Sequence, residues 1–271
     1  MNIQNSKLKF FSIVSGNDDE YQPIKNNFEK YLNIIGLANK HELIVTNTNS
    51  GSWEEGGFLD TVYHKLDITL NYLKKGYYVF CSDLDIIFLK NPLPYLIDLM
   101  ISNNYDILFQ HDYAEEDDGK IYSVYCTGFF LVKPSRMAIK LFDRQVNIFK
   151  RNNQINLPEG DRSDQKYINR KLIQKRFSKL RVESLERALF PNGWYWMKYN
   201  QDIDPYIVHY NCIPGGIKGK EKEMKKLSEK EIKKIVAGRK GSVHGVGNNN
   251  SSPAWAIAPF TGVKGRSVTG L

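Results

Sequence analysis

The stretch that decides the fold runs from Tyr77 to Pro92 and reads Tyr-Tyr-Val-Phe-Cys-Ser-Asp-Leu-Asp-Ile-Ile-Phe-Leu-Lys-Asn-Pro. Its first part, Tyr77–Cys81, has no polar alternation, which predicts a strand buried on both faces, as in a parallel sheet. Asp83 and Asp85 then interrupt the apolar run, which resumes at Ile86. Two carboxylates inside a core are costly unless a cation neutralises them.

A divalent metal ion is the simplest such cation. Residues at i and i+2 point to the same side of a strand, so Asp83 and Asp85 can bind one hard cation, with phosphate oxygens of a ligand completing its shell. An Asp-x-Asp tripeptide is also common in an ordinary polar turn between a strand and a loop. The residues around the pair must decide between these two interpretations.

Length and composition favour one large soluble α/β domain. The chain has 271 residues, of which 41% are hydrophobic and 25% are charged, as is typical of soluble globular proteins. Residues 1–9 show no signal region, and no window approaches the roughly 18 apolar residues of a membrane-spanning helix, so we expect a cytoplasmic protein. Three scattered cysteines without a C-x-x-C pair predict neither disulfides nor a zinc site.

The net charge of +8 is unevenly distributed, because the segment from Lys218 to Lys240 contains ten Lys or Arg and only four Glu. The segment 221–237 reads as a basic helix that could contact an anionic membrane surface peripherally or dock on the body of the protein. From residue 238 onward the chain is rich in Gly, Ser and Asn. We therefore predict a domain of residues 1–237 and a low-complexity tail of residues 238–271, either a linker or an appended segment. The confinement of the charge to one segment argues against a nucleic-acid partner.

Motifs on both sides of the Asp pair resemble the core of nucleotide-sugar-dependent glycosyltransferases. Lys65, a predicted helix over 58–74 and Gly76 precede the pair, and Asn91-Pro92 follows it. The later matches, in the order of that family, are Thr127-Gly128-Phe129-Phe130-Leu131, Asp164-Gln165-Lys166-Tyr167-Ile168-Asn169, Pro191-Asn192-Gly193 and His209-Tyr210-Asn211. Together they look like the nucleotide-diphospho-sugar transferase families, which include glycogenin-like enzymes. The resemblance implies the GT-A fold, an α/β, Rossmann-like architecture with a mostly parallel central sheet, flanking helices and a small antiparallel element at the active site.

The resemblance also implies which residues bind the nucleotide. Asn17 and Tyr21, in the loop after a predicted strand over residues 7–15, would contact the nucleoside, although the loop could equally be an ordinary strand-to-helix connection. Lys65 would face the phosphates or the Asp pair, or it is a solvated helix lysine. Near the C-terminus the sequence departs from the family spacing His-x-x-Gly-x-x-Lys, so Lys218 is our first candidate for the diphosphate and Lys220 the second.

Other residues would hold the metal and the sugar. His209 would complete the site for Mn²⁺ or Mg²⁺ together with the Asp pair, or it is a structural histidine on an apolar strand. Asp164 would meet the donor sugar or the acceptor, or it only favours the dipole of a first helical turn. The remaining residues that the resemblance places against the sugar or the reaction centre are Asp112, Thr127, Gly128 and Gln165.

The resemblance implies a glycosyltransferase that moves a sugar from a nucleoside diphosphate sugar, with UDP-sugars expected, to a hydroxyl of a saccharide, protein or lipid. The resemblance also points to retention of configuration. Inversion needs a carboxylate base on the acceptor hydroxyl and retention does not, and Asp164 could serve either mechanism. An alternative enzyme class is a metal-dependent nucleotidyltransferase or phosphohydrolase that uses the same Asp pair. A third hypothesis is a non-catalytic binder relying on the basic helix, which would leave Asp83 and Asp85 without a purpose.

Overall fold

The computed structural model describes residues 7–15, 19–46, 57–117, 120–143, 163–200, 203–211 and 213–241. Asn17 and most of the predicted tail lie outside these ranges. The chain divides into two units, residues 1–228 and residues 229–271, and the described part of the second unit is the C-terminal portion of one helix. The predicted domain boundary at residue 237 therefore stays a prediction.

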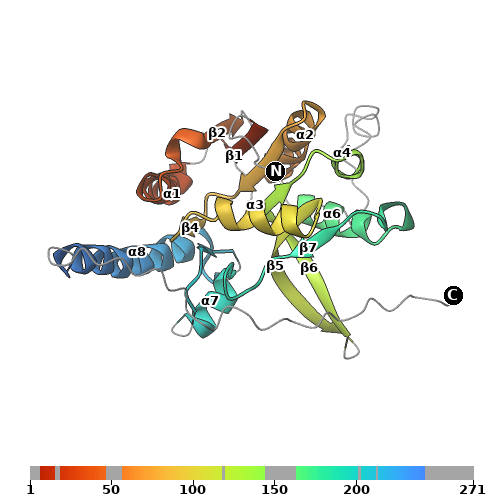
Figure 1. Cartoon of the computed structure of the whole chain (residues 1–271). Helices are drawn as coiled ribbons and strands as arrows, with labels where there is room; N and C mark the ends of the chain where they lie inside the picture. Colours follow the sequence, from red (N-terminus) through yellow and green to blue (C-terminus); the bar gives the residue numbers. More distant parts are fainter. Residues whose placement is uncertain are drawn as a thin grey trace. The chain divides into compact units, whose positions relative to one another are not determined.

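The central sheet has six strands in the order β2-β1-β3-β6-β5-β7 (Figure 1). β2, β1 and β3 are parallel to one another, β6 is antiparallel to both of its neighbours, and β7 is parallel to β5. Most pairings are thus parallel, as predicted, and a separate antiparallel pair, β4 with β8, supplies the small second sheet. The strands are β1 (Leu8–Ser15), β2 (His41–Thr46), β3 (Tyr78–Ser82), β4 (Ile86–Phe88), β5 (Ile107–Asp117), β6 (Lys120–Val132), β7 (Val182–Ser184) and β8 (Ile207–His209).

Helices cover both faces of the sheet. Successive side chains of a strand point to opposite sides, and the inner strands carry apolar side chains on both sides, so each face packs against its own helices. Phe10 and Phe80 pack on one face with α1 (Gln22–Ile34) and α3 (Leu93–Ser102). Phe11, Cys81 and Phe109 pack on the other face with three helices. The inner strands are therefore buried on both sides, which confirms the prediction from the apolar run. The helices of the second face are α2 (Gly57–Lys74), α4 (Arg136–Phe142) and α6 (Asp164–Leu172), and the short 3₁₀ turns are η2 (Asp19–Tyr21), η3 (Ala38–Lys40) and η4 (Lys175–Phe177).

Two local predictions were wrong. The run of four acids at residues 115–118 predicts a solvated loop over 113–120, but β5 continues through Asp117, which pairs with Lys120 of β6. A run of acids does not show whether its backbone pairs with a neighbouring strand. The Asn192-Gly193 dipeptide predicts a tight turn. Instead, the Asn192 side chain accepts a hydrogen bond from the Tyr195 N–H at 2.9 Å and caps α7 (Gly193–Tyr199). Asparagine is among the preferred N-cap residues, so the same letters fit either structure.

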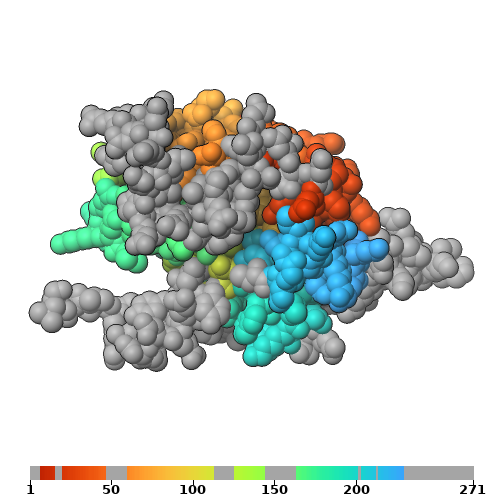
Figure 2. All heavy atoms as spheres, turned by 180° about the vertical axis from the view of Figure 1, so that it is seen from behind, coloured from red at the N-terminus to blue at the C-terminus, as the bar shows by residue number. Residues whose placement is uncertain are grey.

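The basic helix predicted over 221–237 is part of a longer helix, α8 (Gly216–Gly241). Within the first unit, Met224 and Leu227 join the core on the α1 side of the sheet, and Lys30 Nζ donates to Ser228 Oγ at 3.2 Å. Figure 2 shows this blue segment against the red α1. Docking on the body of the protein is therefore observed for α8 up to Ser228, while contact with a membrane stays a prediction. None of the helices among the described residues is long and apolar enough to cross a bilayer.

His41, at the start of β2, makes stability depend on pH. Its Nε2 lies 2.9 Å from Ser12 Oγ, and its ring packs edge-on against Phe10 and Phe28. Burial lowers the pKa of His41 from 6.5 to about 4. Between these values the unfolded chain binds more protons than the folded chain, so the free energy of unfolding falls as the pH falls. At pH 5 we expect a loss of about 2 kcal/mol relative to pH 7.

Urea unfolding at pH 7 and pH 5 tests this expectation. The His41→Gln variant keeps a polar side chain but cannot take up a proton, so the difference between the two pH values should shrink by about 2 kcal/mol. An equal difference in wild type and variant would show that another group causes the pH dependence.

Candidate active site

Asp83, Asp85 and His209 come together, as the sequence predicted for the metal site. One potential ligand atom from each lies within 4.8 Å of the others. The pairing of β4 with β8 explains this, because it places His209 opposite Ile86, the residue after Asp85. The Tyr210 N–H donates to the Asp85 backbone carbonyl at 2.7 Å, which continues the ladder by one step. Residues far apart in sequence thus meet just beyond the end of β3.

Gly128 leaves the space that this cluster occupies. A Cβ atom at that position would lie 2.5 Å from His209 Cε1 and 2.7 Å from Asp83 Oδ2. The Asp83 N–H donates to the Gly128 carbonyl at 2.7 Å, so the close approach is fixed by the backbone. Two carboxylates and an imidazole suit Mn²⁺, and the carboxylates also suit Mg²⁺. The donor atoms of the cluster therefore fit the predicted metal, and Gly128 lets the side chains that carry them come together.

Lys65 of α2 is buried between two carboxylates. Its Nζ lies 3.1 Å from Asp83 Oδ1 and 2.8 Å from Asp164 Oδ2, and its side chain is only 3% exposed. Burial alone would lower the pKa of Lys65, but the carboxylates of Asp164 and Asp83 outweigh burial and raise this pKa well above its ordinary value. Lys65 is therefore not a solvated helix lysine. It is a buried ammonium group that links Asp164 of α6 to Asp83.

Lys220 of α8 is the second cation at the cluster. Its Nζ lies 2.7 Å from Asp85 Oδ2, while His209 Nε2 lies 3.2 Å from Asp85 Oδ1. Burial would raise the pKa of Asp85, but Lys220 and His209 outweigh it, so this pKa is lowered. Burial alone would lower the pKa of Lys220, but the Asp85 carboxylate outweighs burial, so the pKa of Lys220 is raised. Lys218, our first candidate for the diphosphate, is exposed and in the described part of the chain forms no ion pair with either aspartate.

Asp112 is held by amides rather than by cations. It accepts hydrogen bonds from Gln165 Nε2 at 2.9 Å and from Asn211 Nδ2 at 2.7 Å. Asn192 Nδ2 contacts the Asp112 backbone carbonyl. Asn192 and Asn211 belong to motifs that the sequence singled out, yet no role was predicted for either. Their position in short Pro-Asn-Gly and His-Tyr-Asn motifs was the available signal.

The N-terminus of α6 places Asp164 and Gln165 at the cluster. Ser163 caps the helix by accepting from the Lys166 N–H at 3.1 Å. Asn169 fixes the helix to β6, because its amide exchanges two hydrogen bonds with the Tyr125 backbone at 2.9 and 2.8 Å. Asp164 thus faces Lys65 and Gln165 faces Asp112.

The other predicted residues lie nearby or outside the described ranges. Thr127 is buried in β6 directly before Gly128. Tyr21, at the start of α1, is close enough to Lys220 to contribute to the raised pKa of that lysine. Asn17 lies outside the described residues.

These features define an α/β protein in which a cluster of two carboxylates and a histidine, able to hold a metal ion, lies with two lysines beside the end of a central strand. The chain matches the family model of nucleotide-diphospho-sugar transferases over residues 28–224. It belongs to the nucleotide-diphospho-sugar transferase family. The predicted family and the GT-A fold class are thereby confirmed.

Individual proteins resemble this chain to different extents. A UDP-galactose:fucoside alpha-3-galactosyltransferase of Dictyostelium discoideum is 29% identical over an alignment of 208 residues, and the match covers 63% of this chain and 29% of the relative. The chain thus spans less than a third of the length of that relative. A glycosyltransferase involved in glycosylation of the major capsid of PBCV-1 is 14% identical, with a TM-score of 0.49 over 80% of this chain and 98% of that one. The galactosyltransferase LgtC, in complex with donor and acceptor sugar analogues, is 13% identical, with a TM-score of 0.48 over 82% of this chain and 95% of that one.

Proposed function

We propose that the protein transfers a sugar from a UDP-sugar to a saccharide hydroxyl, with retention of configuration and with Mn²⁺ or Mg²⁺ bound by Asp83, Asp85 and His209. The observation that carries the proposal is that one potential ligand atom from each of these three side chains lies within 4.8 Å of the others. Gly128 permits this arrangement, because a Cβ atom there would collide with His209 and Asp83. When bound, the metal would supply positive charge for the leaving diphosphate.

The lysines have separate roles in this proposal. Lys220 lies at the metal cluster with its ammonium group on Asp85, so it is the chain's own donor for oxygens of the leaving diphosphate. Lys65 is enclosed by Asp83 and Asp164 and is already satisfied there. We infer that Lys65 holds the two carboxylates in position rather than contacting the diphosphate.

Retention is supported by the state of the acids near the cluster. A general base must accept the proton of the acceptor hydroxyl. Asp164 is buried and its carboxylate is already engaged by Lys65. Asp112 accepts from two side-chain amides and suits hydrogen bonding to sugar hydroxyls instead. Neither group is therefore placed as an inverting enzyme requires.

The substrate proposals rest on two further observations. The name of the Dictyostelium relative gives UDP-galactose as its donor, which supports a uridine nucleotide here. Trp194, two residues after Asn192, is 48% exposed, and the Lys198 ammonium group lies 5.4 Å from the centroid of its ring, so the ring lies at the surface rather than in the core. Aromatic faces pack well against apolar surfaces of ligands, and we infer that Trp194 contacts the saccharide acceptor.

A donor panel tests the proposed function. Purified protein is incubated with UDP-galactose, UDP-glucose, UDP-N-acetylglucosamine or GDP-mannose, and nucleoside diphosphate release is measured with Mn²⁺, Mg²⁺ or a chelator. We expect release from a UDP-sugar that stops with the chelator and returns with added Mn²⁺. Release that is indifferent to the chelator would overturn the metal role, and preference for GDP-mannose would overturn the donor. The anomeric configuration of the first-formed product, read by NMR, tests retention.

A further inference from the structure

We propose that Gln110 is a positioning residue that sets the tautomer of His209 so that Nε2 can bind the metal. This inference rests on the proposed function. Gln110 is fully buried in β5, directly after the apolar residues Ile107–Phe109. A neutral amide in that place needs partners for both its oxygen and its nitrogen. Its partners show what it does.

The orientation of the Gln110 amide is fixed by two backbone carbonyls. Its Nε2 lies 3.1 Å from the carbonyl oxygen of Phe190 and 3.1 Å from that of Pro191. Carbonyl oxygens only accept hydrogen bonds, so the amide nitrogen must face them. The opposite orientation would place the Gln110 oxygen against two other oxygens and lose both bonds. The amide oxygen therefore faces the interior of the site.

The Gln110 oxygen determines where the His209 ring carries its proton. Oε1 lies 2.6 Å from His209 Nδ1. An amide oxygen cannot donate, so Nδ1 must be the protonated nitrogen of the neutral ring. The lone pair is then on Nε2, which is the ring nitrogen that faces Asp85. A histidine needs that lone pair to bind a metal, and the hydrogen bond made by its other nitrogen selects the tautomer.

Without Gln110 the local chemistry would favour the other tautomer. The Asp85 carboxylate lies 3.2 Å from Nε2, where it can accept a hydrogen bond from an Nε2–H group. A proton held there would block the lone pair. The other side chain near Nδ1 is Cys126, whose Sγ lies 3.9 Å away and is a weak acceptor. Among the described side chains, Gln110 thus provides the strong acceptor that competes with Asp85 for the ring proton.

Gln110 also ties the His209 ring to a second part of the site. Its amide nitrogen donates to the backbone carbonyls of Phe190 and Pro191. The Pro191 carbonyl also accepts a hydrogen bond from the backbone N–H of His209 at 3.1 Å. The next residue, Asn192, contacts the Asp112 backbone. A variant at position 110 could therefore disturb the site generally, so the test needs a readout of the tautomer itself.

The test uses ¹⁵N NMR of the histidine rings in the metal-free chain at pH 8, with His209 assigned from a His209→Gln variant. We expect the wild-type ring to carry its proton on Nδ1. In Gln110→Met, a variant of similar size, we expect the proton to move to Nε2 in much of the population. The Mn²⁺ dissociation constant, measured by electron paramagnetic resonance without nucleotide sugar, should rise by about 10- to 100-fold. The Cys126→Ala control removes the other neighbour of Nδ1 and should keep the wild-type tautomer.

The outcomes separate this inference from the proposed function. A wild-type ring with its proton on Nε2 would overturn the role of Gln110 even if the Gln110→Met chain did not fold. An unchanged tautomer in folded Gln110→Met would also overturn it, whatever the activity. A wild-type chain that carries the proton on Nδ1 but does not bind Mn²⁺ would instead overturn the metal part of the proposed function, and the purpose of Gln110 with it.

Discussion

Replacing Asp85 by asparagine is expected to lower kcat/KM for sugar transfer by about 1000-fold, because the variant loses the carboxylate at the centre of the cluster. Asp85 faces His209 through one oxygen and Lys220 through the other. Charge stabilisation by a bound metal contributes several kcal/mol to a transition state, and about 4 kcal/mol corresponds to a 1000-fold change in rate. Asparagine keeps the size of the side chain, so the fold should be retained.

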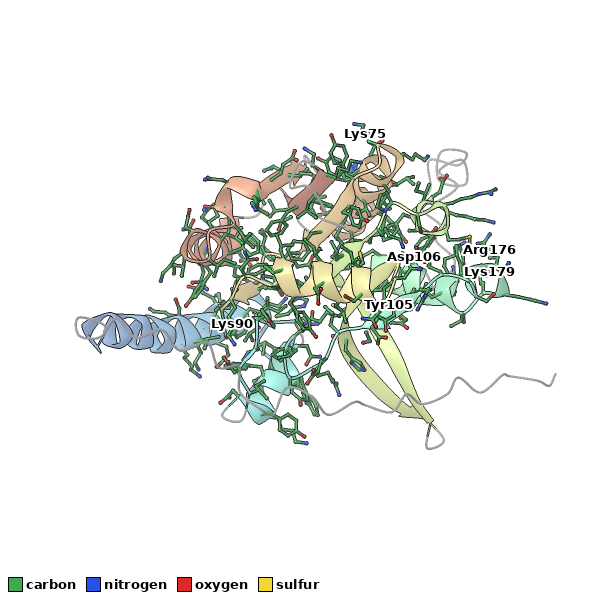
Figure 3. The ribbon with its side chains drawn as sticks, viewed as in Figure 1. Lys75, Lys90, Tyr105, Asp106, Arg176 and Lys179 are labelled. Atoms are coloured by element: carbon green, nitrogen blue, oxygen red, sulfur yellow. The ribbon has the colours of Figure 1, made fainter. Side chains whose placement is uncertain are left out.

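Asp204→Asn is the matched control for this prediction. Asp204 also pairs with a lysine, since its Oδ2 lies 2.5 Å from Nζ of Lys90, but its side chain is 85% exposed. Figure 3 labels Lys90. Exposed pairs contribute little, so the control should keep wild-type activity and Mn²⁺ affinity. UDP release and Mn²⁺ binding are measured for both variants. The proposed metal role would be wrong if Asp85→Asn kept wild-type Mn²⁺ affinity and most of its activity.

The central part of the site could be predicted because it is encoded locally. An apolar run that stops at Asp83 and Asp85 predicts both a buried strand and carboxylates at its end, and the structure shows both. His209 could be assigned to the site only through the family resemblance, because no local sequence pattern shows that β8 pairs with β4. The apolar run predicted a strand buried on both faces, and the family resemblance supplied the fold class. Neither predicted the extension of β5, since strand pairing depends on a partner and not on charge.

Lys220 and Gln110 show what the sequence could not decide. Lys218 and Lys220 are two residues apart in α8, and side chains two apart on a helix do not face the same way. Only the docking of α8 through Met224 and Leu227 decides which lysine faces Asp85. In the sequence, Gln110 is only a polar residue directly after an apolar run, and it lies inside β5. Its role depends on its hydrogen bonds to His209 and Pro191, both of which are remote in sequence.

Replacing Lys65 by methionine is expected to destabilise the folded chain by about 3 to 5 kcal/mol, because removing one partner of a buried ion pair leaves an uncompensated charge. Asp83 is partly exposed and can be rehydrated, but Asp164 is almost fully buried. The cost should therefore come mainly from Asp164. Lys74→Met, on the same helix, is the matched control, because Lys74 lies 3.6 Å from Asp143 with both side chains about half exposed. Its expected effect is below about 1 kcal/mol.

The double variant Lys65→Met/Asp164→Asn locates the source of this cost. If Lys65 acts mainly by neutralising Asp164, removing both charges should cost less than Lys65→Met alone, since buried pairs can often be replaced together with little loss. Urea unfolding followed by circular dichroism gives the three free energies of unfolding. A double variant that is less stable than Lys65→Met would show that Asp164 is tolerated without its cation. In that case the ammonium group would be serving Asp83, and Lys65 would belong with the metal cluster rather than with α6.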